Sequence, residues 1–400
     1  MAEATAPFFS SSEIATWIIA ISILISTILS IMAFLGVSQS MQIRFLKSQI
    51  EGKLRILASY AEESKRSARK KLEEIGVRDP DDVVNVVVDY FVVEPVSIEP
   101  TDIIKRLERV LRTEEERIES IVSSKLVRDV SRDQLNNAVT LLAIANALNT
   151  LYKYVRHILL FGSKTKNVYL IAQLWALLPM YLYIAGAYHK ALRAVYRGVP
   201  IGDAAGPLVA YRLMEELPLI EGPVEVAKDS IYTLHDFEGR FVYVVRAKGP
   251  GSTVGRPGVA VEEIVNKHLA GRKLSAIITV DAALKFEGED SGSLAEGSGV
   301  AMGDPGPEKI RIERIATRLS IPLYAIAVKM SLEEAINTMS KSVLEGVEKA
   351  VEKTKKLILD TARPGEAVIV VGVGNSIGVG LPQSTETQEE GSQDDLGRQP

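Results

Sequence analysis

The sequence predicts an α/β protein with an N-terminal transmembrane helix, a helical region, and a three-layer α/β/α domain that holds a mainly parallel sheet. Three observations carry this prediction. Residues 14–37 form an uninterrupted run of 24 uncharged positions. Helical patterns, most of them charged, occupy much of residues 38–197. From residue 198 to residue 380, helical patterns alternate with short apolar runs, which is typical of βα units whose parallel strands lie between two layers of helices.

Composition excludes several classes of function. The 400 residues include no cysteine, which excludes disulfides, Cys-ligated zinc and thiol catalysis. The four histidines stand at positions 157, 189, 235 and 268, and none is paired at the spacing of metal ligands. The net charge is −4, and no basic stripe is interleaved with aromatic residues, so we expect no nucleic-acid partner.

The first predicted helix, residues 14–37, is long enough to cross a hydrocarbon core of roughly 30 Å. A secretory signal would need a basic leader, whereas Glu3 and Glu13 are the charged residues before the run. Basic residues follow the run at Arg44, Lys47, Lys53 and Arg55. The positive-inside bias therefore predicts a single-pass protein of the cell membrane, with residues 1–13 outside and the rest in the cytoplasm. Self-association of the chain stays open.

The helical region should form a stalk and a bundle. Residues 41–71, 101–130 and 135–161 show helical patterns, and residues 83–93 are ambiguous between helix and strand. Residues 168–187 are 20 uncharged positions with basic residues on both sides, which gives no orientation. We expect them to form a buried or membrane-grazing helix in place of a second span.

In the α/β domain, strands are expected at residues 241–245, 276–280, 323–328 and 367–371. Helices are expected at residues 204–217, 259–269, 308–319 and 331–359, the last opened by a capping box of Ser331 and Glu334. The polar, acidic residues 381–400 should be disordered.

We expect two aspartates to lie at the same edge of the sheet. Asp281 comes directly after the strand 276–280, ahead of a long glycine-rich loop, and Asp203 opens a helix. Ligands of open α/β sheets bind beyond the carboxyl ends of the strands. Taken singly, Asp203 is explained as a helix cap and Asp281 as the start of a turn. Together, two close carboxylates cannot both ionise freely, so one would keep a proton while the other polarises water.

The same edge of the sheet could also bind a metal or another ligand. The pair Asp203 and Asp281 could instead hold a divalent metal through oxygen ligands. The loop 248–258 is rich in glycine and proline, and its backbone amides could cradle an anion or a peptide carbonyl. The residues expected to bind substrate there are Lys248, Gly249, Gly251, Gly255 and Arg256. A Gly-Val-Gly-Asn turn, with Gly374 and Asn375, follows the last strand, and neither a P-loop nor a dinucleotide fingerprint occurs.

Five segments, in order, resemble motifs of the bacterial spore germination protease family. They are Gly202-Asp203-Ala-Ala-Gly-Pro-Leu-Val209, Gly249-Pro-Gly-Ser-Thr-Val-Gly-Arg-Pro-Gly258, Ile277-Ile-Thr-Val-Asp281-Ala-Ala-Leu284, Asp290-Ser-Gly with Gly297-Ser-Gly299, and Ile321-Pro-Leu-Tyr-Ala-Ile-Ala327. The resemblance implies the fold shared with the hydrogenase-maturation proteases. It also implies active-site roles for Asp203, Asp281 and Asp290, with the glycine loops, including Gly297 and Gly299, binding the substrate backbone.

The order of elements departs from that family in one respect. The family places a strand ending in Gly-x-Gly-Asn before the first acidic loop, whereas here Gly372-Val-Gly-Asn375 lies near the C-terminus. We therefore expect a circular permutation in which residues 367–371 fill the slot of the missing first strand. No histidine follows position 268, which speaks against nickel-dependent processing.

The whole chain also resembles an archaeal family of membrane-anchored proteins described as domain of unknown function 1512, which implies no activity. Three functions stay open. The first is a membrane-tethered, peptidase-like hydrolase that acts on a peptide or protein through Asp203 and Asp281. The second is a non-catalytic module that binds an anion or a nucleotide, and the third is a membrane scaffold.

Overall fold

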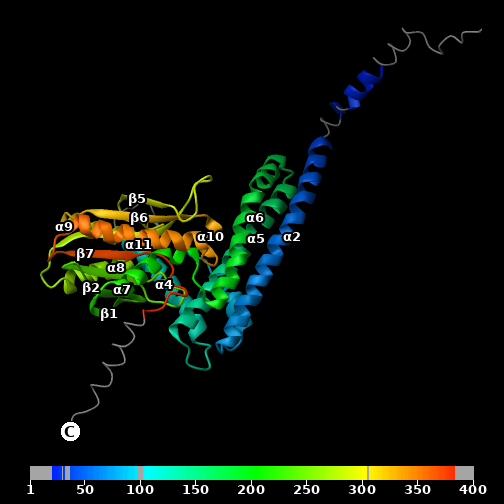
Figure 1. Cartoon of the computed structure of the whole chain (residues 1–400). Helices are drawn as coiled ribbons and strands as arrows, with labels where there is room; N and C mark the ends of the chain where they lie inside the picture. The colour runs from blue at the N-terminus through cyan, green and yellow to red at the C-terminus, as the bar shows by residue number, and fades with distance from the viewer. Residues whose placement is uncertain (1–19, 29, 32–36, 97–101, 304–305, 383–400) are drawn as a thin grey trace, which may run out of the picture. The chain divides into compact units, whose positions relative to one another are not determined.

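The computed structural model describes residues 20–28, 30, 31, 37–96, 102–303 and 306–382, which form two compact units (Figure 1). The first unit consists of residues Met1–Ser59 and Leu151–Tyr183, and the second of Tyr60–Thr150 and Ile184–Pro400. Most of the expected disordered segment 381–400 and the N-terminal residues 1–13 lie outside the described residues.

The first unit is built from parts of three long helices: α2 (Val37–Glu74), α5 (Arg132–Lys164) and α6 (Val168–Arg197). Its interior is apolar and includes Ile50, Val155 and Ile171, which are fully buried. Pro179 lies inside α6, and the helix continues on both sides of it.

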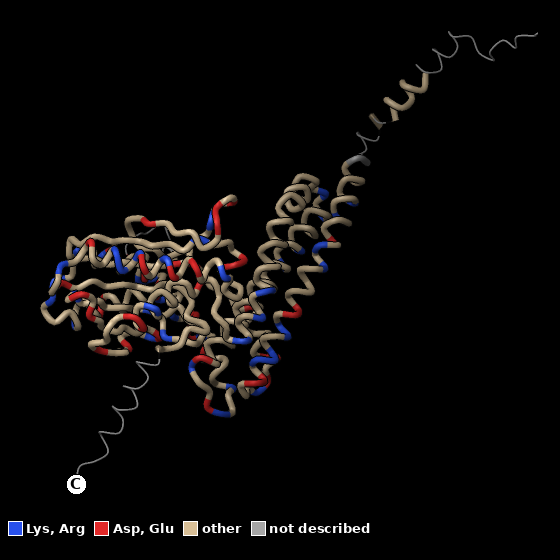
Figure 2. The backbone as a smooth tube through the Cα atoms, in the orientation of Figure 1, with Lys and Arg blue, Asp and Glu red and all other residues tan. Residues whose placement is uncertain are grey.

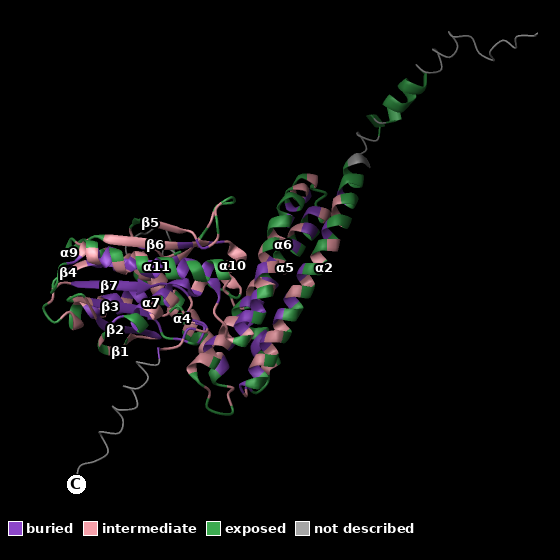
Figure 3. Cartoon of the chain, in the orientation of Figure 1, coloured by how far each residue is buried: buried purple, intermediate pink, exposed green. Residues whose placement is uncertain are grey.

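Much of the surface of the first unit is apolar. The described N-terminal helical residues, 20–28, 30 and 31, are exposed, and large apolar side chains of α5 and α6 are exposed as well (Figure 3). Those of α5 and α6 are Tyr154, Leu160, Phe161, Tyr169, Trp175, Leu177, Met180 and Tyr183. Few charged residues lie along these stretches (Figure 2). Among the described residues, one helix, Val168–Arg197, is both long enough and apolar enough to cross a membrane. In its most apolar stretch of 18 residues, 22 % is buried. The expected helix over residues 168–187 is confirmed. Of the two alternatives expected for it, burial holds for only part of the helix, and contact with a membrane stays a prediction.

The second unit holds one seven-stranded sheet in the order β1-β2-β3-β7-β4-β6-β5. The strands are β1 (Leu219–Ala227), β2 (Ser230–Phe237), β3 (Arg240–Ala247), β4 (Leu274–Leu284), β5 (Leu294–Ser298), β6 (Leu323–Met330) and β7 (Ala367–Gly372). The four central strands, β3, β7, β4 and β6, are parallel, and β1, β2 and β5 are antiparallel to their neighbours. The predicted three-layer α/β fold with a mainly parallel sheet is confirmed.

Helices cover both faces of the sheet. On one face lie α7 (Ala205–Glu216) and α11 (Lys341–Thr361), and on the other α8 (Pro257–Glu263), a π-turn η2 (Ile264–His268) and α9 (Pro307–Leu319). The central strand β7 shows why its sequence is a continuous apolar run. Val368 and Val370 pack toward α7 and α11, whereas Ile369 and Val371 pack toward α8 and α9, so every residue of the strand is buried.

The remaining helices are α3 (Pro80–Val88), α4 (Ile103–Ser123) and α10 (Leu332–Ile336). The ambiguity over residues 83–93 is thus resolved as helix up to Val88. The capping box of Ser331 and Glu334 is present, but the helix predicted for residues 331–359 is wrong in its continuity. The first helix, α10, ends at Ile336, and α11 begins separately at Lys341, where the hydroxyl of Ser340 accepts the N–H of Val343.

Three further expectations on strands are corrected. The strand expected at 276–280 extends through Asp281 to Leu284, because β6 pairs with it from Ile277 to Leu284. The segment 294–298, taken as loop, is the edge strand β5. The hairpin of β1 and β2 was not predicted at all.

A close contact joins α7 to the sheet, and it depends on Gly206. A Cβ atom on this residue would lie 2.1 Å from the carbonyl oxygen of Val373 and 2.4 Å from that of Val280. Both neighbours are backbone atoms of the central strands and cannot rotate away. Replacing Gly206 must therefore move the helix or the strand ends.

We predict that Gly206→Ala lowers the free energy of unfolding by about 1–3 kcal/mol, the usual cost of overpacking. Gly186→Ala is the matched control, because Gly186 lies inside α6 with nothing within 4 Å of the added methyl. The control should stabilise the protein by roughly 0.5–1 kcal/mol. Thermal or denaturant unfolding of the full chain measures both, and equal effects of the two substitutions would contradict the packing argument.

Candidate active site

Three segments far apart in the sequence meet at the carboxyl edge of the sheet. Strand β7 ends at Gly372, and the N–H of Val373 donates to the carbonyl of Val280 at 2.8 Å, which brings the following turn alongside Asp281 of β4. A short 3-10 turn, η1 (Gly202–Ala204), carries Asp203 to the same place. There the backbone N–H of Asn375 donates to Oδ2 of Asp203 at 3.0 Å.

Gly374 allows this approach. Its φ of +125° lies in the region that favours glycine, and a Cβ on it would be 2.1 Å from the carbonyl oxygen of Asp203. The Gly-Val-Gly-Asn turn therefore positions the first aspartate through its backbone shape and through the amide of Asn375.

The surroundings of Asp281 strongly perturb its carboxyl group. It is 6 % exposed, and burial is the main cause that raises its pKa to about 8. The charge of Asp203 is the second cause, which requires the two carboxyl groups to be near each other. The N–H groups of Ala282 and Gly303 and the charge of Lys309 act in the opposite direction and are weaker.

Asp203 is less enclosed than Asp281, because part of its surface is open to solvent. Burial raises its pKa, and the hydrogen bond from Asn375 opposes that shift. The two carboxyl groups thus share one low-dielectric region but differ in depth. Such a pair keeps one proton between its two members at neutral pH.

Asp203 is not the cap of α7, and Asp281 does not begin a turn. The cap residue of α7 is Ala204, and the Asp203 carboxylate accepts the amide of Asn375 from the neighbouring turn. Asp281 does not start a turn, because β4 continues to Leu284. Asp290 is placed differently: it is exposed on the loop after β4, and its carbonyl oxygen bonds Ser293. No hydrogen bond or charge interaction within the described part of the chain joins Asp290 to the pair.

The loop 248–258 lies against the Gly-Val-Gly-Asn turn and is bonded within the chain. The N–H of Ser376 donates to the carbonyl of Thr253 at 2.8 Å, and the N–H of Gly251 donates to Oδ1 of Asp133 at 2.8 Å. Two more of its glycines are packed against backbone: added Cβ atoms would lie 2.1 Å from the oxygen of Val379 at Gly249, and 2.6 Å from that of Asp229 at Gly255. The loop therefore braces the turn, in place of the expected cradle for a ligand.

The two cations of this loop are neutralised elsewhere. Lys248 bonds Glu225 at 3.2 Å and Arg256 bonds Glu115 at 3.0 Å. Gly297 and Gly299 lie in and just after the edge strand β5, with nothing within 4 Å of an added Cβ. The structure thus gathers Asp203, Asp281, Gly374 and Asn375 and leaves the other expected site residues in supporting or peripheral positions.

Ser252 is a member of the site that sequence reasoning missed. Its hydroxyl accepts from Nδ2 of Asn375 at 2.9 Å and from Thr140 at 2.9 Å, and its N–H donates to Asn137 at 2.8 Å. Asn375 is thereby held from both ends, with its backbone on Asp203 and its amide on Ser252. The polar residues of α5 were a signal for a packed bundle, but nothing in the sequence paired them with this loop.

Glu308 was also missed. Its Oε2 accepts the N–H groups of Gly258 at 2.7 Å and Val259 at 3.1 Å, so the first amides of α8 bond the chain's own carboxylate. Burial raises the pKa of Glu308.

Possible metal ligands and cavities among the described residues bear on what the pair could bind. Within the described ranges, no group of three or more His, Asp or Glu side chains could hold a metal ion. Two cavities, of about 800 and 680 Å³, are lined by other residues. Asp203 is partly exposed and Asp281 is buried.

The chain belongs to the DUF1512 family. The family's N-terminal domain, described as a protein of unknown function, matches residues 24–198, and its C-terminal domain, described as a domain of unknown function, matches residues 201–380. The expectation of this family is confirmed. No curated protein and no solved structure matches the chain, so the likeness to the germination protease stays a prediction.

The raised pKa of Asp281 makes stability depend on pH. Between about pH 4 and pH 8 the folded protein holds a proton that the unfolded chain has released, so the free energy of unfolding falls as pH rises. The slope from one such proton is about 1.4 kcal/mol per pH unit. We predict that Asp281→Asn removes this slope and stabilises the protein at neutral pH. Asp360→Asn, at an exposed position of α11, should keep the wild-type profile. Denaturant unfolding at a series of pH values tests this, and parallel profiles for wild type and Asp281→Asn would count against the buried-pair geometry.

Proposed function

We propose that the protein is a membrane-tethered hydrolase of peptide bonds that uses Asp203 and Asp281. One observation carries the proposal: the turn after β7 bonds both Val280, next to Asp281, and the carboxylate of Asp203, so the two carboxyl groups meet at the edge of the sheet. The charge of Asp203 accordingly helps to raise the pKa of Asp281 to about 8. Two neighbouring carboxyl groups with different proton affinities are the minimum equipment for general acid–base hydrolysis without a cofactor.

The two carboxyl groups take different roles in the proposed reaction, one as acid and one as base. We assign the proton at neutral pH to Asp281, whose pKa burial raises to about 8, and the role of the base to Asp203, which accepts the N–H of Asn375. Asp203 takes a proton from a water molecule while the oxygen of that water attacks the peptide carbonyl carbon. Asp281 gives its proton to the carbonyl oxygen. Asp203 then protonates the amide nitrogen as the C–N bond breaks, and Asp281 recovers its proton from the new hydroxyl. The net change is the addition of one water molecule across the bond.

The motif order supports the same proposal. The resemblance to the germination protease requires the Gly-Val-Gly-Asn strand to fill a central slot beside the strand that carries the second aspartate. Strand β7 lies between β3 and β4, and its turn meets Asp203. This placement is what a circular permutation of the protease fold would produce.

A metal-dependent variant of the proposal uses the same residues. Asp203 and Asp281 would supply two carboxylate ligands, and a divalent cation prefers six or more oxygens, so most ligands would be water or substrate. Turnover that is lost with a chelator and restored by a divalent cation would select this variant.

A non-catalytic binding module is the second candidate. The enclosure of Asp281, which is 6 % exposed, favours it, because a buried carboxyl group reaches a substrate less readily. Binding of a peptide or nucleotide without turnover would select this candidate.

The tether is the part of the proposal that concerns residues 14–37. About half of these residues lie outside the described ranges, and the described ones form exposed apolar helix, including Leu24 and Ile25. The basic residues that follow, Arg44 and Lys47 first, support an orientation with the aspartate pair in the cytoplasm. The helix Val168–Arg197 is the rival segment for membrane contact.

We predict that Asp203→Asn and Asp281→Asn each lower peptide hydrolysis by about a hundredfold or more, since each removes one proton-transfer group. Release of new amino groups from unfolded casein by the purified full chain measures turnover. Asp360→Asn controls for the loss of a surface carboxylate, and Asp290→Asn should retain turnover because Asp290 lies away from the pair. Full activity of both pair variants would end the catalytic proposal.

We further predict that the double variant Leu24→Arg/Ile25→Arg is released from membranes by alkaline carbonate, because two arginines at a helix centre oppose insertion by about 5 kcal/mol. The matched variant Leu177→Arg/Met180→Arg alters two exposed residues of α6 and should stay in the membrane fraction. The reverse pattern would move the tether to α6.

A further inference from the structure

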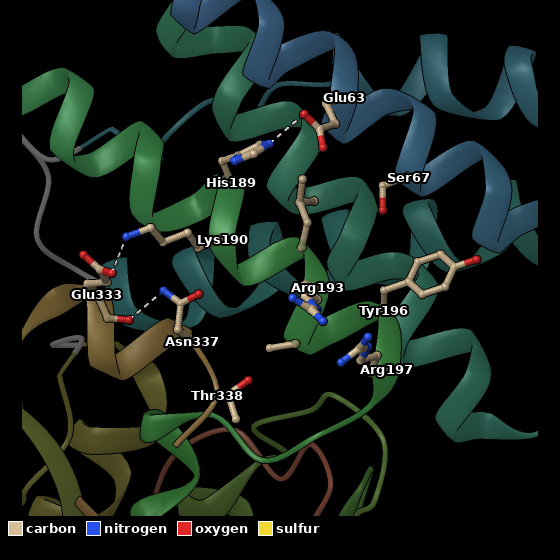
Figure 4. A pocket seen from close by; sticks show the side chains of 12 residues that line it. Glu63, Ser67, His189, Lys190, Arg193, Tyr196, Arg197, Glu333, Asn337 and Thr338 are labelled. Carbon is tan, nitrogen blue, oxygen red and sulfur yellow. Dashed lines mark hydrogen bonds and ion pairs between the residues drawn. The ribbon is translucent and has the colours of Figure 1, made fainter. Parts of the chain in front are cut away.

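A cavity of about 680 Å³ lies apart from the aspartate pair, in the second unit (Figure 4). Its walls come from α2, from α6 and from the residues around the end of α10. None of the residues that line it takes part in the aspartate site, so its chemistry has to be explained independently.

One face of α6 makes this cavity basic. His189, Arg193 and Arg197 follow each other at intervals of four residues, and Lys190 lies beside them. Side chains four residues apart are neighbours on a helix surface, so their charges repel one another unless acids compensate them.

Acids compensate two of these groups. Lys190 Nζ lies 2.6 Å from Oε1 of Glu333, and His189 Nε2 lies 2.8 Å from Oε2 of Glu63, as the dashed lines in Figure 4 mark. These two pairs use the carboxylates that line the cavity.

Arg193 and Arg197 are left over. Both are exposed, and within the part of the chain that the structure describes neither forms an ion pair or a hydrogen bond. Figure 4 shows their guanidinium groups turned toward the same part of the cavity. Two uncompensated charges in one concave surface are a surplus that a bound anion would neutralise.

Neutral hydroxyl groups complete the lining. Ser67 comes from α2, opposite α6, and Thr338 from the segment after α10.

We infer that this cavity binds a phosphate-bearing anion through Arg193 and Arg197. The planar guanidinium fork donates two parallel hydrogen bonds to a tetrahedral oxyanion, and two forks on successive turns can hold several oxygens of one phosphate or of two linked phosphates. The hydroxyls of Ser67 and Thr338 can donate to the remaining oxygens. The phosphate group is common to a free organic phosphate and to a lipid headgroup.

Calorimetric titration of the full chain in detergent tests the site with two probes at constant ionic strength: inorganic pyrophosphate and short-chain phosphatidic acid. Saturable binding of either probe is expected, and the tighter of the two identifies the source of the phosphate. In Arg193→Gln/Arg197→Gln the affinity should fall about tenfold or more, as expected for lost hydrogen bonds between charged groups.

The control is Arg55→Gln/Arg156→Gln, which removes the same charge from two exposed arginines outside the cavity and should bind as wild type does. Equal thermal midpoints of the two double variants exclude unfolding as the cause of a loss. The inference is overturned if wild type takes up neither probe saturably, or if both double variants lose the same affinity.

Discussion

The structure of the α/β unit depends on direct backbone contact where α7 meets the ends of β7 and β4. Gly206 lies against the carbonyl oxygens of Val373 and Val280, and a Cβ on Gly372 would lie 2.4 Å from the oxygen of Gly206. Without side chains between them, the turn that precedes α7 reaches the level of the strand ends. Asp203 can then accept the amide of Asn375 and act on Asp281. A wider gap would admit water, and both carboxyl groups would ionise normally.

The sequence was sufficient for the parts of the fold that follow from local pattern. The buried parallel strands are apolar runs, and the helices between them carry one apolar face, so the layers and the shared carboxyl edge were predictable. The edge strands β1 and β5 consist of half-exposed or exposed residues, which give no continuous apolar run. Strand β2 is mostly buried, but Ser230, Thr233 and His235 interrupt its apolar residues. β1 also contains Gly222 and Pro223 and pairs with irregular register, which further weakens the pattern.

The glycine-rich loop shows why site residues were harder to predict than the fold. Glycine indicates that something comes close to the backbone, but it does not indicate what. At Gly251 the neighbour is Asp133, more than a hundred residues away along the chain, and at Gly374 it is Asp203. The charges of Lys248 and Arg256 were likewise visible in the sequence, whereas their partners on β1 and α4 are set by the tertiary fold.

The asymmetry of the aspartate pair comes from depth more than from any single partner. Asp281 receives amide hydrogen bonds from Ala282 and Gly303 and lies near the charge of Lys309, all of which favour its ionised form. Burial has the larger effect on the pKa, because removing a carboxylate from water costs more free energy than two amide hydrogen bonds and the charge of Lys309 contribute. Burial raises the pKa of Asp203 as well, and its amide donor, the N–H of Asn375, opposes that shift. Negative charge on Asp203 adds to the effect of burial on Asp281 and favours the protonated form of Asp281.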